Sequence, residues 1–99
     1  MTDVCLSLLG APELEEKLLD HLLMSPAVAT FTSQRIASHG GHPADLDPGE
    51  QVLGRGEAVL VLAVLDAADV ERLLMELREA FVGSGLRYWQ CPVLSQGEL

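Results

Sequence analysis

The stretch that most limits how this chain can fold is "EAVLVLAVL", residues 57–65, in which every position from Ala58 onward is apolar. The run is far shorter than the roughly 20 residues that cross a bilayer, and it has the length of a strand. A strand in an antiparallel sheet with one wet face alternates apolar and polar residues. This run does not alternate, so it predicts a central strand with both faces covered.

The first part of the chain predicts a strand, a helix and another strand. Val4–Leu9 is short and apolar, and it predicts a buried strand that Gly10 ends. Residues 11–26 have leucines every four positions and finish at Pro26, which is the pattern of an amphipathic helix. Residues 27–38 are rich in β-branched and small side chains, which favours a more polar strand.

The last part of the chain predicts a helix and a final strand. Asp66 begins a segment with apolar residues at the i, i+3, i+4 spacing of a helix that covers a core, and Gly83 and Gly85 end it. Residues 86–94 predict an edge strand, because Pro92 cannot donate to a ladder. The order is that of an α+β, ferredoxin-like βαββαβ fold, with an antiparallel four-stranded sheet and two helices on one face. We expect a single domain over residues 1–99.

The second face of such a sheet needs a cover that this chain does not supply. Both helices lie on the first face, and the sequence has no third helix. We therefore predict a homo-oligomer whose sheets pack on one another. The alternative is a monomer with an exposed apolar face, which would invite aggregation.

The charge balance and the motifs exclude several classes of protein. With 15 acidic and 6 basic residues the net charge is −9, and no basic stripe suits nucleic acid or an anionic membrane surface. No apolar segment is long enough to embed the chain in a membrane. The N-terminal residues lack the basic segment of a signal peptide, so we expect a cytoplasmic protein with reduced thiols. There is no phosphate-binding loop and no nucleophile motif, so we do not expect an enzyme.

The candidate functional segment is the loop Ser38–Gly54, between the second and third predicted strands. Structureless loops longer than about 12–15 residues are uncommon in compact domains and are usually functional or mobile. Imidazole suits zinc, copper, nickel and cobalt, and carboxylates complete such sites. The candidate ligands of a transition-metal ion are His39, His42, Asp45, Asp47 and Glu50. The competing interpretation is a solvated loop whose glycines and prolines only set turns.

Two cysteines form a second, weaker candidate. Cys5 lies near the start of the first strand and Cys91 near the end of the fourth, and these strands are antiparallel neighbours in the predicted fold. Two thiolates could make a soft metal site or a redox pair. The favoured interpretation is two small buried apolar side chains. Tyr88 and Trp89 are interpreted as core and interface residues.

Several segments resemble the PII-like family called domain of unknown function 3240. They are "FTSQRIASHG" (Phe31–Gly40), "EQVLGRGEAV" (Glu50–Val59), "REAFVGSGL" (Arg78–Leu86) and "LRYWQCPVL" (Leu86–Leu94). The resemblance covers nearly the whole chain, and the set is more specific than any single segment.

The resemblance implies a homotrimer whose sheets pack around a central axis. It makes residues 38–54 the counterpart of the T-loop, the mobile finger by which PII-like proteins engage partners. Members of this family are often encoded beside heavy-metal efflux pumps of the resistance-nodulation-division type. The implied role is a cytosolic regulator or sensor for metal export, with such a pump as partner.

Two alternatives stay open. An adenine-nucleotide sensor would place Arg35, Arg55 and Arg87 against phosphate across a subunit interface. The resemblance also makes Gly83–Gly85 the counterpart of the loop that helps hold the nucleotide in nitrogen-regulatory PII proteins. In those proteins the loop is longer, and more basic residues surround the phosphates. Since this chain carries −9, ATP binding of the usual kind is not expected. The other alternative is an adaptor that docks through its loop and takes no small ligand.

Overall fold

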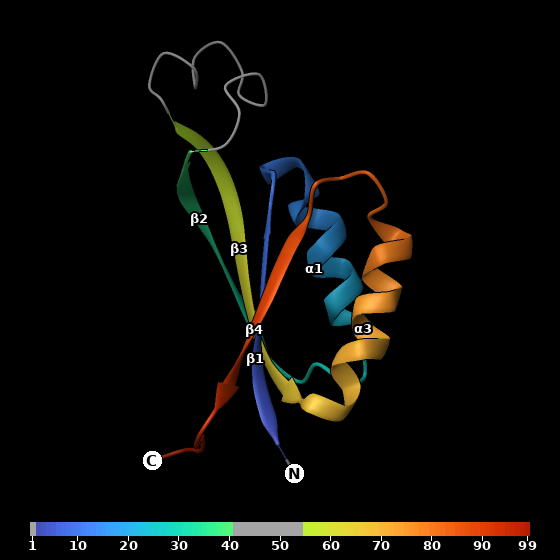
Figure 1. Ribbon diagram of the computed structural model, residues 1–99, viewed down its shortest axis with the longest axis vertical. Coiled ribbons are helices and arrows are strands. Elements are labelled where there is room, and N and C mark those ends of the chain that lie inside the picture. The colour runs from blue at the N-terminus through green and yellow to red at the C-terminus, as the bar shows by residue number, and fades with distance from the viewer. Residues whose placement is uncertain (1, 41–54) are drawn as a thin grey trace.

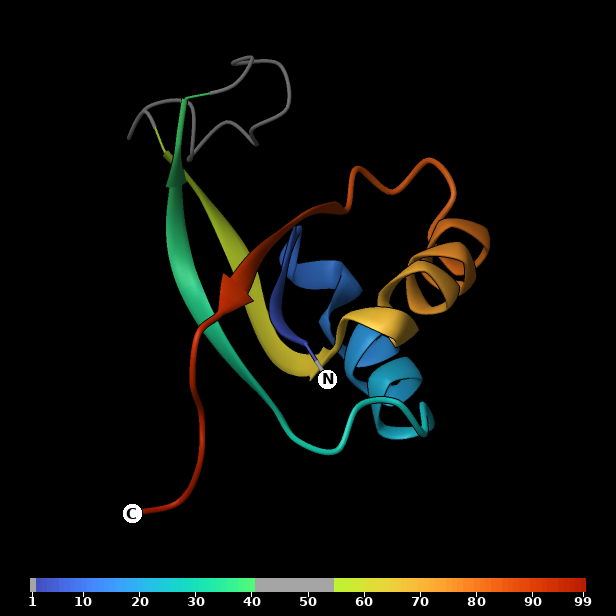
Figure 2. The ribbon, with the colours of Figure 1, turned by 60° about the horizontal axis from the view of Figure 1, so that its bottom comes forward.

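The computed structural model describes residues 2–40 and 55–99, without the side chain of Arg55. Its elements are β1 (Asp3–Gly10), the short 3-10 helix η1 (Pro12–Leu14), α1 (Glu15–Leu23), β2 (Phe31–His39), β3 (Arg55–Asp66), α3 (Ala67–Ala80) and β4 (Arg87–Val93). The strands form one antiparallel sheet in the order β2-β3-β1-β4, with β1 and β3 central. Both helices lie on the same side of this sheet (Figures 1 and 2). The predicted α+β, ferredoxin-like arrangement is confirmed.

The core lies between the sheet and the helices. Every second residue of the central strands points into it, and Leu6, Leu8 and Val61 are almost completely buried. The helices contribute the side chains at their i, i+3, i+4 positions, which are Leu18, Leu22, Val70, Leu73, Leu74 and Leu77. Burial of one such leucine contributes about 1.5–3 kcal/mol, so this layer is the main source of the fold's stability.

The other side of the sheet, which we call the open face, has no helix or strand over it within the described ranges (Figure 2). Its apolar and sulfur-bearing members are Cys5, Leu9, Ile36, Ala58, Leu60, Leu62, Val64, Trp89, Cys91 and Val93. Leu62 is 36% exposed and Trp89 42% exposed. The chain itself therefore buries the residues of 58–65 that face the helices. Within the described ranges, no helix or strand covers those that lie on the open face.

Local contacts join the two helices and fix their ends. The Asp66 side chain accepts a hydrogen bond from the Ala68 backbone N–H at 2.9 Å, which caps the N-terminus of α3. Lys17 donates to the carbonyl of Ala80 and its Nζ lies 4.8 Å from the centre of the Phe81 ring. These contacts hold the C-terminus of α3 against α1, just before the chain turns into β4.

Two predicted boundaries were wrong. The amphipathic helix ends at Leu23, and β2 begins only at Phe31. The backbone between them makes turn hydrogen bonds, from Ser25 to Leu22 and from Val28 to Ser25, so it cannot extend the strand. Val28 is nevertheless buried. The segment therefore contains an apolar β-branched residue, as a strand would, although its backbone is not extended. None of the helices in the described part of the chain is long and apolar enough to cross a membrane.

Candidate functional site

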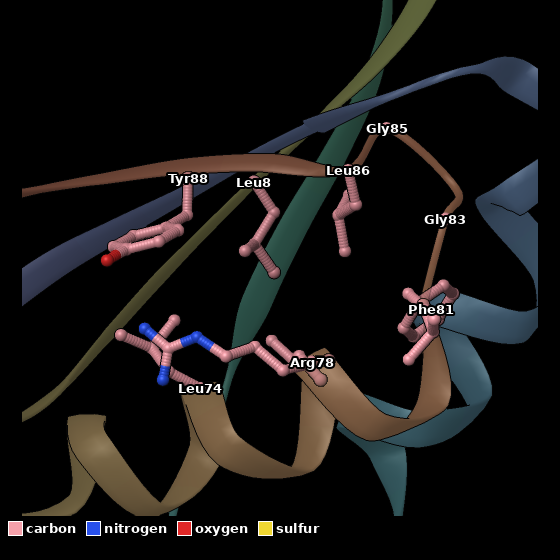
Figure 3. A pocket seen from close by; sticks show the side chains of 10 residues that line it. Leu8, Leu74, Arg78, Phe81, Gly83, Gly85, Leu86 and Tyr88 are labelled. Atoms are coloured by element: carbon pink, nitrogen blue, oxygen red, sulfur yellow. The ribbon is translucent and has the colours of Figure 1, made fainter.

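A pocket of about 260 Å³ lies between the second half of α3, β1 and the first half of β4 (Figure 3). Its lining residues are Leu8, Leu74, Leu77, Arg78, Phe81, Val82, Gly83, Gly85, Leu86 and Tyr88. Most of the lining is aliphatic or aromatic, and it is continuous with the core beneath it. The pocket is therefore an apolar cleft with few polar groups at its rim, which is the usual character of a small-molecule site.

The turn from α3 to β4 shapes one end of this pocket. Gly83 and Gly85 have φ of +71° and +79°, a conformation that residues with a Cβ rarely adopt. Between them, Ser84 Oγ accepts a hydrogen bond from the Leu86 N–H at 3.2 Å, and the Ser84 N–H donates to the Phe81 carbonyl at 3.1 Å. The two glycines thus make the chain reverse within a few residues, so that β4 returns over α3.

Arg78 and Tyr88 give the pocket its polar end. Figure 3 shows the Arg78 guanidinium and the Tyr88 ring at one end and Phe81 at the other. In the described part of the chain, the Arg78 guanidinium makes no hydrogen bond or ion pair. A guanidinium presents a planar fork of donors that matches carboxylate or phosphate. The arrangement suits a ligand with a flat apolar body and a small anionic group.

The residues proposed for nucleotide binding fall in different places. Gly83 and Gly85 border the pocket, whereas Arg87 pairs with Leu9 and so lies on the open face. Arg35 lies on the opposite edge strand, β2, and on the helix side of the sheet. A single chain therefore does not bring Arg35 and Arg87 together.

Arg35 is also engaged elsewhere. Its Nη2 lies 3.0 Å from Glu15 Oε1, and its Nε lies 3.4 Å from Glu15 Oε2. The hydrogen bond and the charge of Glu15 raise the pKa of Arg35 above its usual value. This contact ties β2 to the start of α1, so Arg35 has a structural partner within its own chain. Arg55 is the first residue of β3, and its side chain is not among those described.

The metal-ligand predictions are only partly placed. His39 is exposed at the end of β2, while His42, Asp45, Asp47 and Glu50 lie outside the described residues, as does most of the segment 38–54. Within residues 2–40 and 55–99, no group of three or more histidine, cysteine or acidic side chains is placed to hold a metal ion. Cys5 and Cys91, the weaker candidates, are direct partners in the register of β1 and β4. The favoured interpretation of two buried side chains was wrong for the single chain, because Cys5 is half-buried and Cys91 is exposed at the edge of the sheet.

Sequence reasoning missed Arg78 and Tyr88 as site residues. Arg78 is one of several charged residues between the apolar positions of its helix, and Tyr88 was interpreted with Trp89 as core and interface. For this chain alone the core interpretation was wrong, because Tyr88 is 46% exposed and Trp89 42% exposed on the edge strand β4. The available signal was strand alternation, which puts Tyr88 on the same face as Leu8, beside α3.

Comparison with known proteins identifies the family. The family model described as "Protein of unknown function (DUF3240)" matches residues 1–99, so the chain belongs to this family. No curated protein matches the sequence. The fold is similar to that of a DUF3240 family protein from Shewanella baltica OS155, with a TM-score of 0.82 and 20% identity over 100% of this chain and 98% of that one.

Two further proteins share the fold at lower identity. CPII, a nitrogen regulatory PII-like protein from Thiomonas intermedia K12 bound to ADP, AMP and bicarbonate, has a TM-score of 0.74 and 14% identity over 100% of this chain and 98% of that one. The GlnK–ATP complex of Bacillus subtilis has a TM-score of 0.68 and 13% identity over 93% and 82%. The predicted PII-like fold and the predicted membership of the DUF3240 family are thus confirmed.

Proposed function

We propose that this chain is a PII-like regulatory protein that self-associates through the open face and responds to a small anionic ligand bound beside Gly83–Gly85. The observation that carries the proposal is the pocket between α3 and β4, an apolar cleft with the Arg78 guanidinium at one end. That guanidinium has no hydrogen-bond or ion-pair partner among the residues that the structure describes. Two proteins of the same fold, CPII and GlnK, are described with adenine nucleotides bound. Since the fold alone does not fix a function, the pocket's own chemistry supports the ligand class.

The ligand class that fits this chemistry is an adenine nucleotide with few phosphates. An adenine ring matches the aliphatic and aromatic lining, and one phosphate matches the fork of Arg78. Each further phosphate adds negative charge to a chain that already carries −9. Among the described residues, the pocket lining contains no second arginine or lysine to offset that charge. We therefore expect AMP to bind at least as well as ADP, and both to bind better than ATP.

The test is calorimetric titration of the protein with AMP, ADP and ATP. Arg78→Gln should weaken AMP binding about tenfold or more, because a charge-assisted hydrogen bond is worth about 1.5–3 kcal/mol. Arg72→Gln is the matched control, because this substitution removes the same charge from the same helix. Arg72 does not line this pocket. Equal loss in both variants would mean that only net charge matters, and silence with all three nucleotides would reject the ligand class.

Metal binding by the segment 38–54 is the second candidate function. It is supported by the exposed position of His39 at the end of β2, directly before the remaining candidate ligands. The pair His39→Ala and His42→Ala should abolish binding of zinc, copper(I), nickel or cobalt without affecting AMP. Uptake by the double variant equal to that of the parent would reject this assignment. Regulation of a heavy-metal efflux pump through the same segment is the corresponding proposal for a partner.

Self-association as a homotrimer is the third part of the proposal. It is supported by the open face, where apolar side chains from β3, β1 and β4 have no cover within the described ranges. Sedimentation velocity should give a trimer at micromolar concentration. A monomer at that concentration would contradict this part and leave the pocket proposal standing.

A further inference from the structure

Phe81 contacts both the pocket and α1. It is the C-cap residue of α3, it is 6% exposed, and it forms the end of the pocket nearest α1 (Figure 3). Two side chains of α1 meet its ring. Lys17 Nζ lies 4.8 Å from the ring centre, and the His21 ring stands edge-on, with 6.5 Å between the ring centres and 65° between the planes. Phe81 is therefore a wall that the pocket shares with α1.

Lys17 holds this wall by two contacts. Besides lying near the ring, its ammonium group donates a hydrogen bond to the carbonyl of Ala80. The last carbonyls of a helix have no donor within the helix, so this bond satisfies one of them. An ammonium group is also attracted to the face of an aromatic ring. Loss of Lys17 would loosen both the last turn of α3 and the Phe81 ring.

A second contact joins α1 to the same part of α3. His21 Nε2 lies 3.4 Å from Glu76 Oε2, and both side chains are partly exposed. Lys17 is exposed as well. These side chains lie on the helix side of the molecule, which the proposed self-association through the open face leaves uncovered. They can therefore be replaced without leaving a cavity in the core.

We propose that α1 controls the ligand affinity of the pocket through Phe81, a statement that rests on the proposed function because it concerns the same site. Lys17 and His21 are positioning residues, since they hold Phe81 and lie outside the pocket lining. They keep the ring where a flat ligand meets a formed wall. Without them the wall is formed for only a fraction of the time, and the apparent dissociation constant rises by the reciprocal of that fraction.

Such coupling acts in both directions. A ligand that binds better when Phe81 is held must itself hold Phe81 more firmly. AMP should therefore shift the nuclear magnetic resonance signals of the His21 ring, although His21 does not line the pocket. His39 is the internal control, because it is exposed at the end of β2, on the opposite edge of the sheet from β4. A merely structural role of His21 would leave its signals unchanged.

The test is calorimetric titration of AMP into variants of this contact. Lys17→Met should raise the dissociation constant about two- to fivefold, the size expected for one cation at an aromatic ring. Lys17→Arg should restore most of the affinity, because a guanidinium can also lie over a ring and donate to a carbonyl. His21→Ala should weaken binding in the same direction. Circular dichroism checks that each variant is folded.

Two controls exclude general effects. Arg72→Gln removes one positive charge from the helix layer without touching Phe81, so it measures the effect of net charge. Asp66→Ala removes the cap at the other end of α3, so it measures the effect of helix stability. Both should bind AMP like the parent.

The shape of the pocket can also be followed without a ligand. Leu77 and Leu86 line the pocket together with Phe81. An aromatic ring shifts the resonances of nearby methyl groups, so their methyl signals should move in Lys17→Met and return in Lys17→Arg.

The outcomes separate this proposal from the proposed function. Equal AMP affinity of the parent and Lys17→Met would overturn the proposal and leave the ligand site standing. A loss that Arg72→Gln or Asp66→Ala reproduces would overturn it too, because charge or helix stability would then be the cause. If the parent does not bind AMP, the proposed function is rejected, and the methyl signals decide whether α1 shapes the pocket. Unchanged signals of Leu77 and Leu86 in Lys17→Met would show that it does not.

Discussion

Leu62→Lys is the substitution that best distinguishes a self-associating protein from a monomer with an exposed apolar sheet face. Leu62 lies in the middle of the open face on the central strand β3, opposite Ser7 on β1. In the single chain it is 36% exposed. A lysine there keeps a long aliphatic stem that can lie on the sheet, so the isolated chain should remain folded.

The expected effect on association follows from burial. Full burial of a leucine is worth about 1.5–3 kcal/mol, so removing the exposed third from water on association adds about 0.5–1 kcal/mol per chain. The lysine loses this contribution and must also desolvate an ammonium group, which costs several kcal/mol. We expect association to weaken by about 3 kcal/mol or more per chain, or by more than about 100-fold.

Sedimentation velocity over a range of concentrations measures this effect. Met75→Lys is the control, because Met75 is exposed on α3 at the other side of the molecule and the change in charge is the same. Because each chain is acidic, an added lysine lowers the repulsion between chains. Dissociation of the Leu62→Lys variant would therefore be caused by the lost contact and the buried ammonium group at the interface. If Leu62→Lys sediments like its parent while remaining folded, the open face is not the interface.

Three stability predictions follow from the described contacts. Leu6→Ala should lower the free energy of unfolding by about 2–5 kcal/mol, because Leu6 is fully buried in the central strand β1; urea unfolding would show it, and a loss below about 1 kcal/mol would contradict the packing. Asp66→Ala should cost about 1 kcal/mol and Asp66→Asn almost nothing, because asparagine can also cap α3; equal losses would reject the cap. Gly83→Ala should destabilise by about 1–2 kcal/mol, because the added Cβ is strained at φ +71°, whereas Gly97→Ala should be neutral in the same thermal melts.

The order of elements was predictable because each has a strong local pattern. Leucines at helical spacing, an uninterrupted apolar run and paired glycines after a helix each admit few alternatives. The start of β2 was not predictable, because residues 27–30 have strand composition but a buried Val28 holds them in the connection from α1. Composition does not distinguish a packed connection from a strand.

The site was less predictable than the fold. Gly83 and Gly85 were singled out, but the polar end of the pocket depends on Arg78 and Tyr88, which meet only because the turn brings β4 back over α3. Likewise, neighbouring strands made a meeting of Cys5 and Cys91 conceivable, yet a slip of one residue would have placed them on opposite faces. The register decides such questions, and it is a property of the whole sheet.

The most direct test of the account is a nuclear magnetic resonance titration of the ¹⁵N-labelled protein with AMP. We predict that the amides that shift belong to the pocket between α3 and β4, led by Arg78, Gly83, Gly85 and Tyr88. The same titration of Arg78→Gln should need about tenfold more AMP to reach the same shifts. Shifts confined to residues 38–55, or no shifts at all, would contradict a ligand site beside the α3–β4 turn.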